Sequence, residues 1–228
     1  MKKITLCFLG CLLSFSLQAQ RFEIKNASKF YDAKIDVGCE QNECSGHAKI
    51  ELYKKGQKQV FQRFESDGLS MELDQHGKPS SNIVQMYGEQ SALIFDDFNF
   101  DGQQDLAIRS GDDGPYGGPT YDIYVFNRTR HAFVLSAELS DLTQENLGMF
   151  SVDAKHQRIG VMSKDGCCWH LWQQYQVVPN KGLKLVYTRE EDAMSTMGEK
   201  VIVTERKLIQ GKWKTTVKKY PIKTYYGE

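Results

Sequence analysis

The sequence predicts an all-β protein whose antiparallel hairpins form a sandwich or a small propeller-like domain. From residue 46 onward, short runs rich in β-branched and aromatic residues recur at regular intervals, and Gly- or Asn-containing turns separate them. A helical pattern is expected only near 142–146, with Ser140 or Asp141 as its N-cap. Together these observations indicate strands joined by hairpins rather than a helical or mixed fold.

The expected strands follow one another along the chain. Turns such as Lys54-Lys55-Gly56 and Gln210-Gly211 match the chemistry of hairpins. The strands are predicted over 47–52, 59–64, 83–87, 92–95, 105–109, 121–126, 132–135, 149–152, 158–162, 170–178, 183–187, 201–208 and 213–219. We therefore expect a β domain over 46–228. Residues 20–45 show no clear periodicity and are expected to form an N-terminal extension.

The N-terminus has the pattern of a secretory signal peptide over residues 1–19. Lys2 and Lys3 precede an apolar stretch, and cleavage is expected after Ala19. The apolar stretch is shorter than the roughly 20 residues that a membrane span requires, so no span is expected. Processing as a lipoprotein at Cys11 is the alternative. The pattern predicts a periplasmic or secreted protein.

The net charge of the chain limits the classes of partner that are expected. Removing Lys2 and Lys3 with the signal peptide lowers the number of basic residues from 29 to 27, against 29 acidic residues. The resulting formal charge of −2 gives no overall signature for binding nucleic acid or an anionic membrane. Oligomeric state is left open by these data.

Four cysteines remain after cleavage, and an exported protein favours disulfides. Cys39 and Cys44 are spaced to close a hairpin, which would leave the adjacent Cys167 and Cys168 as the second pair. Neighbouring Cα atoms lie about 3.8 Å apart, below the usual disulfide range. Pairing between the two ends of the chain therefore stays open.

The segment 97–105 has the pattern D-x-N-x-D-G-x-x-D, which is typical of a calcium loop. Oxygen-bearing side chains stand at every second position, as a hard cation such as Ca²⁺ prefers. Ile108 stands where an EF-hand has its bidentate glutamate, so an EF-hand is excluded. The alternative is an acidic hairpin turn without metal. The expected ligands are Asp97, Asn99, Asp101, Gln103 through its carbonyl, and Asp105.

No catalytic constellation is evident, so we expect a protein that is not an enzyme. The five histidines are scattered, and none lies in a nucleophile elbow or a zinc-protease helix motif. The densest group of carboxylates is the one assigned to calcium. Cys167-Cys168 lacks the spacing of a zinc site.

The segment 110–121 directly follows the calcium loop and is rich in glycine and proline. We expect an irregular loop that calcium holds in place, with Tyr116 and Tyr121 supplying contact area for a partner. Asp112 or Asp113 is a further candidate for the calcium shell. A plain surface connector is the alternative.

These motifs resemble a group of exported bacterial proteins. The resemblance rests on residues 97–106, the Ser110-Gly111 pair, Tyr121 to Tyr124 and the Gly166 to His170 segment. The group includes periplasmic immunity proteins that neutralise peptidoglycan hydrolases delivered by type IV secretion systems. It looks related to periplasmic lysozyme inhibitors, whose Ser-Gly-x-x-Tyr loop enters the cleft of the hydrolase. Here the next tyrosine, Tyr116, comes two residues later than in that pattern.

The resemblance implies a calcium-binding inhibitor of a peptidoglycan hydrolase or lysozyme. It implies Ser110, Gly111, Tyr116 and Tyr121 as the partner-binding residues. Similar loops occur in integrin-like repeats and in lectin-like proteins. The alternative is therefore a calcium-dependent module that binds a glycan or a protein, with Trp169, Trp172 and Tyr175 as its saccharide platform.

Overall fold

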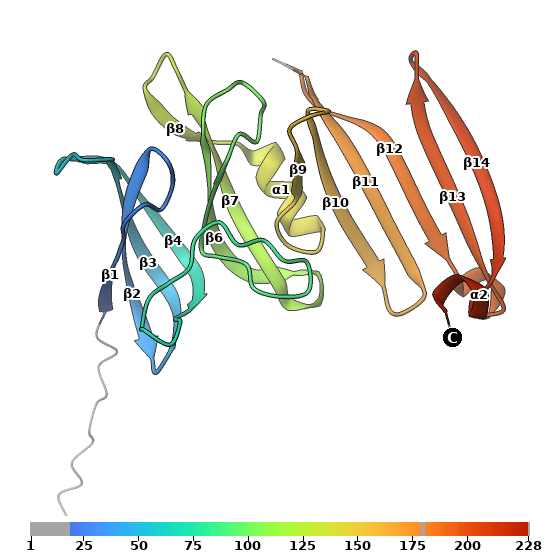
Figure 1. The fold of residues 1–228 in the computed structure, drawn as a ribbon, viewed down its shortest axis with the longest axis horizontal. Helices are drawn as coiled ribbons and strands as arrows, with labels where there is room; N and C mark the ends of the chain where they lie inside the picture. Colours follow the sequence, from blue (N-terminus) through green and yellow to red (C-terminus); the bar gives the residue numbers. More distant parts are fainter. Residues whose placement is uncertain (1–18, 179–180, 228) are drawn as a thin grey trace, which may run out of the picture.

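The computed structural model describes residues 19–178 and 181–227. Residues 1–18 of the expected signal peptide lie outside this range. The described residues form three antiparallel sheets with two short α-helices, which confirms the all-β prediction (Figure 1). Within the described residues, no helix combines the length and apolar character that crossing a bilayer requires.

The first sheet is a meander in the order β1-β2-β3-β4. Its strands are β1 (Ala19–Ile24), β2 (Tyr31–Glu40), β3 (Glu43–Lys54) and β4 (Val60–Glu72). In β2, Ala33, Ile35 and Val37 alternate with more exposed residues and point into the core. The expected extension over 20–45 is therefore wrong, because alternation in 31–37 with Asp and Lys at the outward positions is a strand pattern.

The second sheet has the order β5-β6-β7-β8 and packs face to face on the first. Its strands are β5 (Leu93–Asp96), β6 (Asp105–Gly114), β7 (Gly118–Asn127) and β8 (Ala132–Leu135). Fully buried Ile50 and Leu52 of β3 share one core with Leu106 and Ile108 of β6. The first two sheets thus form a β-sandwich.

The other face of the second sheet carries a second core. Helix α1 (Ala137–Glu145) lies there, and Leu139 and Leu142 pack with Tyr121 and Ile123 of β7. The helix begins several residues before the expected segment, after Ser136 as N-cap. Ile159 and Val161 of the third sheet complete this core.

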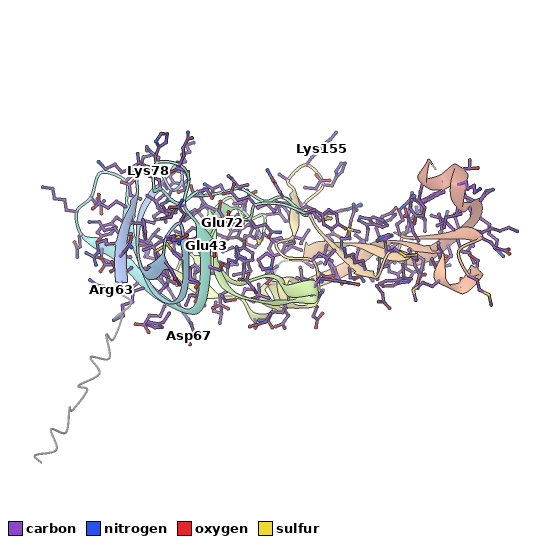
Figure 2. The ribbon with its side chains drawn as sticks, turned by 90° about the horizontal axis from the view of Figure 1, so that it is seen from below. Glu43, Arg63, Asp67, Glu72, Lys78 and Lys155 are labelled. Carbon is purple, nitrogen blue, oxygen red and sulfur yellow. A yellow bond between two sulfur atoms is a disulfide. The ribbon has the colours of Figure 1, made fainter. Side chains whose placement is uncertain are left out.

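The third sheet has six strands in the order β14-β13-β12-β11-β10-β9. They are β9 (Ser151–Asp153), β10 (Arg158–Asp165), β11 (Trp169–Val178), β12 (Gly182–Asp192), β13 (Lys200–Ile209) and β14 (Lys212–Pro221), followed by α2 (Ile222–Tyr226). Seen at 90° to the first view, β11 to β14 extend away from the sandwich as a thin layer (Figure 2).

One expected strand is replaced by irregular chain. Residues 83–87 form only the isolated bridge between Val84 and Gln90. Gly88 follows Tyr87 directly, and the turn at this glycine ends the pairing after one bridge. The segment 79–89 therefore runs over the surface, where Met86 and Tyr87 are exposed, before the chain enters the interior at Gln90 and Ser91.

Candidate functional site

The expected calcium loop joins β5 to β6 at one end of the sandwich. Phe98 anchors it: the ring is fully buried and meets Phe150 edge-on, with ring centroids 5.3 Å apart. Phe100 has φ +59° and Gly102 has φ +80°, which turn the chain sharply between the oxygen-bearing residues. The apolar residues of the motif fix the loop, as the alternation in the sequence indicated.

The carboxylates and the amide of the loop accept hydrogen bonds from its own backbone. Asp97 accepts from the N–H groups of Asp101 at 3.0 Å and Gly102 at 2.8 Å. Asn99 Oδ1 accepts from the Asp101 N–H at 3.0 Å, and Asp101 Oδ1 accepts from the N–H of Gln103 at 2.8 Å. The side-chain oxygens therefore face the interior of the loop.

Asp105 is the buried member of the motif, with no exposed surface. Its Oδ2 accepts from the Phe98 N–H at 2.9 Å, and its Oδ1 accepts from the Phe126 N–H at 2.8 Å. Burial, with the nearby charge of Asp101, raises the pKa of the Asp105 carboxyl to about 7. Asp105 has no cationic partner among the ion pairs of the described residues.

The five expected ligands share one loop but do not form a ready metal cluster. No group of three or more His, Cys, Asp or Glu side chains in 19–178 and 181–227 is arranged to hold a metal. The side-chain amide of Gln103 donates to the Gly102 carbonyl at 3.0 Å. The donor atoms are oxygens suited to calcium, while their present partners are amides.

The segment 110–121 is a bulged β-hairpin rather than an irregular loop, with register shifts between Arg109 and Gly111 and between Gly111 and Gly114. Ser110 and Gly111 lie in β6, and Gly111 is buried. Tyr121 is also fully buried, and its hydroxyl donates to the Ser91 carbonyl at 3.0 Å. Burial raises the pKa of that hydroxyl. Gly111 and Tyr121 are thus placed in the interior, which makes their predicted contact with a partner wrong.

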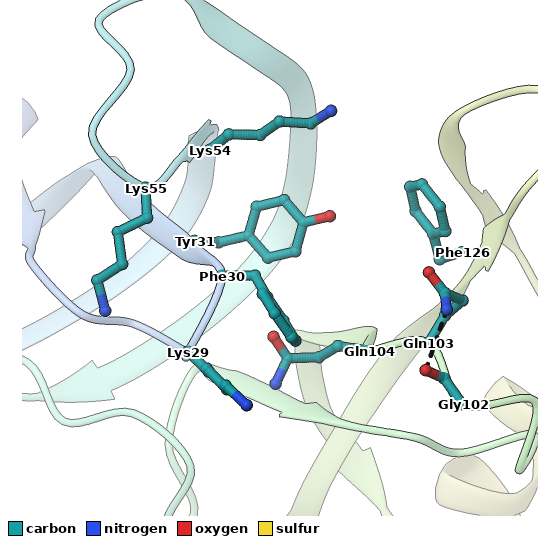
Figure 3. Close-up of a pocket in the computed structure, with 9 residues that line it drawn as sticks. All are labelled: Lys29, Phe30, Tyr31, Lys54, Lys55, Gly102, Gln103, Gln104 and Phe126. Atoms are coloured by element: carbon teal, nitrogen blue, oxygen red, sulfur yellow. Dashed lines mark hydrogen bonds between the residues drawn. The ribbon is translucent and has the colours of Figure 1, made fainter.

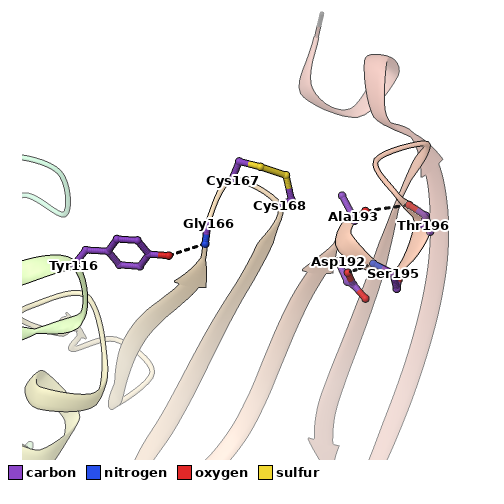
Figure 4. Close-up of a disulfide and its surroundings, with 8 residues drawn as sticks. All are labelled: Tyr116, Gly166, Cys167, Cys168, Asp192, Ala193, Ser195 and Thr196. Atoms are coloured by element: carbon purple, nitrogen blue, oxygen red, sulfur yellow. Dashed lines mark hydrogen bonds between the residues drawn. A yellow bond between two sulfur atoms is a disulfide. The ribbon is translucent and has the colours of Figure 1, made fainter.

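Tyr116 is the exposed member of that predicted set. It stands at the tip of the β6–β7 hairpin, in a single 3₁₀ turn over Pro115–Gly117, with φ +60° and 62 % of its surface exposed. Its hydroxyl accepts a 2.6 Å hydrogen bond from the Gly166 N–H (Figure 4). The Lys164 ammonium lies 4.7 Å from the centroid of its ring. Gly166 and Lys164, which lie outside the β6–β7 hairpin, therefore hold the tip in place.

Exposed apolar side chains continue on both sides of Tyr116. The Lys164 ammonium also lies 5.1 Å from the ring centroid of Tyr87, which is 71 % exposed. On the other side, the Ala193 N–H donates to the Cys168 carbonyl at 2.8 Å, which places the turn after β12 beside Cys167-Cys168. We define the exposed rim as Met86, Tyr87, Tyr116, Met194 and Met197.

Of the five rim residues, the sequence pattern predicts only Tyr116 as a contact residue. A local signal was present: Tyr87 and Met197 each precede a glycine, in Tyr87-Gly88 and Met197-Gly198. Met197 is 97 % exposed.

Both local disulfides form, and pairing across the chain does not. Cys39 bonds to Cys44 across the β2–β3 hairpin, with Cα atoms 4.0 Å apart. Cys167 bonds to Cys168 in the β10–β11 turn (Figure 4). The second disulfide lies in the same turn as the Gly166 N–H that binds Tyr116.

The calcium loop and the Tyr116 tip lie at opposite ends of β6. The ten residues of β6 separate them by about 30 Å. Asp112 forms an ion pair with Arg109 near the tip end and is remote from the loop. The expectation that calcium holds the segment 110–121, with Asp112 or Asp113 in the shell, is therefore wrong.

The aromatic residues of β11 do not form one platform. Strand alternation places Trp169 and Trp172 on opposite faces of the sheet. The Trp169 indole donates to Glu190 at 2.8 Å, and Tyr175 packs against the second core. The platform expected for the glycan-binding alternative is thus absent from β11.

A cleft of about 440 Å³ lies beside the calcium loop (Figure 3). Gly102, Gln103 and Gln104 form one wall, and Lys29, Phe30 and Lys55 belong to the opposite wall. Phe30 is 52 % exposed. This cleft has the volume of a small-ligand site, but its lining residues do not indicate a particular ligand.

Comparisons with known proteins support the fold. No family model matches the chain, and no curated protein matches it. One solved structure, described as that of a Xanthomonas type IV secretion system related protein, superposes with a TM-score of 0.63 and 22 % identity. The match covers 86 % of this chain and 92 % of the other. This chain therefore shares its fold with a protein related to type IV secretion.

Proposed function

We propose that this protein is a non-catalytic inhibitor that binds a peptidoglycan hydrolase or lysozyme through the exposed rim. The observation that carries this proposal is the rim itself, where two tyrosines and three methionines remain exposed on the loop before β5, the β6–β7 turn and the turn after β12. Tyrosine and methionine are enriched in protein interfaces, and a cluster of them marks a binding surface better than scattered apolar residues do.

The tip is suited to entering a cleft. The hydrogen bond from Gly166 and the Lys164 ammonium hold Tyr116 before any partner arrives. A side chain fixed in advance loses less conformational entropy on binding. Tyr116 would fill the cleft, and Tyr87 with the methionines would close the contact around it.

Three further observations agree with this proposal. The fold neighbour is described as related to type IV secretion. The local disulfides are compatible with an oxidising compartment such as the periplasm. The resemblance of the sequence to immunity proteins of the same secretion systems points the same way.

We propose in addition that Ca²⁺ binds the 97–105 loop and stabilises that end of the sandwich. Asp105 is a buried carboxylate without a cationic partner among the described ion pairs, and burying an uncompensated charge is costly. Asp97, Asn99 and Asp101 would turn from backbone amides towards the ion. Its role would be structural and local, given the distance to the tip.

The test is clearing of a peptidoglycan suspension by lysozyme and by a type IV secreted hydrolase, with purified protein added. Wild type should inhibit, and Tyr116→Ala should weaken inhibition at least 30-fold, since an interface hot spot is worth about 2 kcal/mol or more. Phe30→Ala is the matched control, because Phe30 is a comparably exposed aromatic residue away from the rim.

Equal loss of inhibition in Phe30→Ala and Tyr116→Ala would reject the rim as the docking site. Failure to inhibit every hydrolase tested, with calcium present, would reject the inhibitor function for those enzymes. Clearing of the suspension by the protein alone would show that it is a hydrolase instead.

A further inference from the structure

Charge is strongly segregated along the chain, although the total is near zero. Residues 200–223 hold eight basic residues and one acidic residue, a net charge of +7. The other residues hold 21 basic and 28 acidic residues, a net charge of −7. The basic part coincides with the β13–β14 hairpin and the start of α2. A sum over the whole chain conceals this hairpin.

The hairpin lies at the far end of the molecule from the sandwich, and β14 is the free edge of the six-stranded sheet (Figure 1). From Lys212 to Lys219 every residue of β14 is exposed. Alternation along β14 places Lys212, Lys214 and Lys218 on one face and Trp213, Val217 and Lys219 on the other. Ile209 pairs with Lys212, so basic and apolar side chains stand on both faces. No layer formed by the described residues covers either face along this stretch of β14.

The lysines of β14 are electrostatically unpaired. Among the ion pairs within 19–178 and 181–227, none involves Lys212, Lys214, Lys218 or Lys219. Four cations on one strand repel one another, and no ion pair of the described residues compensates them. Their charge is therefore available to an external anionic partner.

Lysines on an edge strand commonly serve to prevent aggregation, yet this strand also exposes apolar side chains. Val217 is 55 % exposed, Ile209 is 42 % exposed and Trp213 is 38 % exposed. Exposed apolar side chains favour association with other chains. They would therefore counteract an edge strand whose lysines served only to prevent aggregation. Lysine beside exposed tryptophan and aliphatic residues is instead the composition of segments that lie in the interface of an anionic bilayer.

We propose that the β13–β14 hairpin docks the protein peripherally on an anionic lipid bilayer. The lysines would meet lipid phosphates, and Trp213, Ile209 and Val217 would enter the headgroup region. A bilayer surface suits a thin strand pair with basic and apolar residues on both faces, whereas a folded protein would need a matching groove. Docking at this end would leave the sandwich, with Tyr87 and Tyr116 of the rim, extended away from the lipid.

Co-sedimentation of the purified protein with vesicles of phosphatidylglycerol and phosphatidylethanolamine tests this, with phosphatidylcholine vesicles in parallel. Binding should be confined to the anionic vesicles and should weaken as salt rises from 50 to 200 mM, as expected for screened charges. The variant Lys212→Gln, Lys214→Gln, Lys218→Gln should bind about 100-fold more weakly, at about fivefold per lysine.

The matched control also removes three exposed lysines, but from the first sheet and its adjoining loops: Lys25→Gln, Lys49→Gln, Lys78→Gln. It should bind within about threefold of wild type. Vesicles should shift the tryptophan emission of wild type to shorter wavelength, and Trp213→Phe should abolish that shift. Circular dichroism confirms that each variant is folded.

Three results would overturn the proposal. They are equal binding to both kinds of vesicle, equal weakening in the two triple variants, and binding to an acidic protein such as a polyglutamate fusion without binding to vesicles. The last result would assign the hairpin to an acidic protein partner. None of these measurements depends on hydrolase inhibition, so the two proposals stand or fall separately.

Discussion

The sandwich and the free part of the third sheet are built from the same kind of strand but are stabilised differently. In β3, Ala48, Ile50 and Leu52 are fully buried between two sheets. In β14, eight consecutive residues are exposed and the strand is held by its ladder to β13. Burial of apolar surface dominates the first region, while hydrogen bonds and cross-strand pairs dominate the second.

The difference separates stability from binding. A strand covered on its inner face has little freedom to vary without loss of stability. A strand exposed on both faces carries little of the core and can present side chains to partners. Both proposed binding surfaces, the rim and the basic hairpin, accordingly include parts of the third sheet.

The largest expected contrast is between truncations of apolar side chains in the two regions. Ile50→Ala should lower the free energy of unfolding by about 3–4 kcal/mol, because it leaves a cavity between the sheets. Val217→Ala should change it by less than about 0.5 kcal/mol, because Val217 is exposed. Urea denaturation of both variants measures the difference. Similar losses would show that β14 is covered in solution.

Within the sandwich, the stability losses of Asp105 and Asp97 variants distinguish a residue that supports the fold from one that binds an ion. Asp105→Ala should cost about 2–3 kcal/mol even in EDTA, because the buried N–H groups of Phe98 and Phe126 lose their acceptor. Asp97→Ala should cost less than about 1 kcal/mol in EDTA.

The stabilisation that calcium adds should also separate the ion-binding role of Asp97 from the structural role of Asp105. At a concentration 100 times the dissociation constant, Ca²⁺ should stabilise wild type by about 2.7 kcal/mol. Asp97→Ala should lose most of this gain. Thermal melts with calcium and with EDTA measure both quantities. An unchanged wild-type melting temperature at millimolar calcium would contradict the proposed ion site.

The two disulfides extend the comparison to covalent links. Replacing Cys39 and Cys44 by serine should cost about 2 kcal/mol, since the bond closes a short loop. Cys44 is also buried in the core of the sandwich. Replacing Cys167 and Cys168 should cost less than about 1 kcal/mol, because adjacent residues enclose almost no chain. Denaturation of each serine pair, without reductant, measures the two losses.

The same pair of variants separates stability from function. Loss of the Cys167–Cys168 bond should instead weaken inhibition, because Gly166 in the same turn holds Tyr116. A large stability loss without any change in inhibition would contradict this assignment.

The sequence predicted most strands from local alternation and turn residues, and the β13–β14 hairpin from Gln210-Gly211. It failed where the decisive information was the packing of distant segments. Tyr121 appeared to belong to a binding loop, yet α1 and the Ser91 carbonyl bury it. Glycine and proline in 111–119 suggested an irregular loop, because the pairing of β6 with β7 is not visible locally.

The candidate site was only partly predictable for the same reason. The spacing in 97–105 identified a loop with oxygen donors, and Tyr116 was named as a contact residue. Tyr87 and Lys164 come from separate parts of the chain and meet each other and Tyr116 only in the fold. The sum of charges likewise hid the +7 of residues 200–223, because summation discards position.

The smallest expected contrast concerns side-chain pairs. In the sandwich, Tyr31 meets Phe133 edge-on with ring centroids 5.4 Å apart, while on the free hairpin the Arg206 guanidinium lies 5.0 Å from the ring of Trp213. Double-mutant cycles with alanine should give a coupling of about 1 kcal/mol for the aromatic pair and about 0.5 kcal/mol for the exposed cation–π pair. Raising salt to 1 M should reduce the second coupling and leave the first unchanged, because only the second involves a charge in contact with solvent. A salt-insensitive coupling above 1 kcal/mol for Arg206 and Trp213 would mean that the free sheet is packed as tightly as the sandwich.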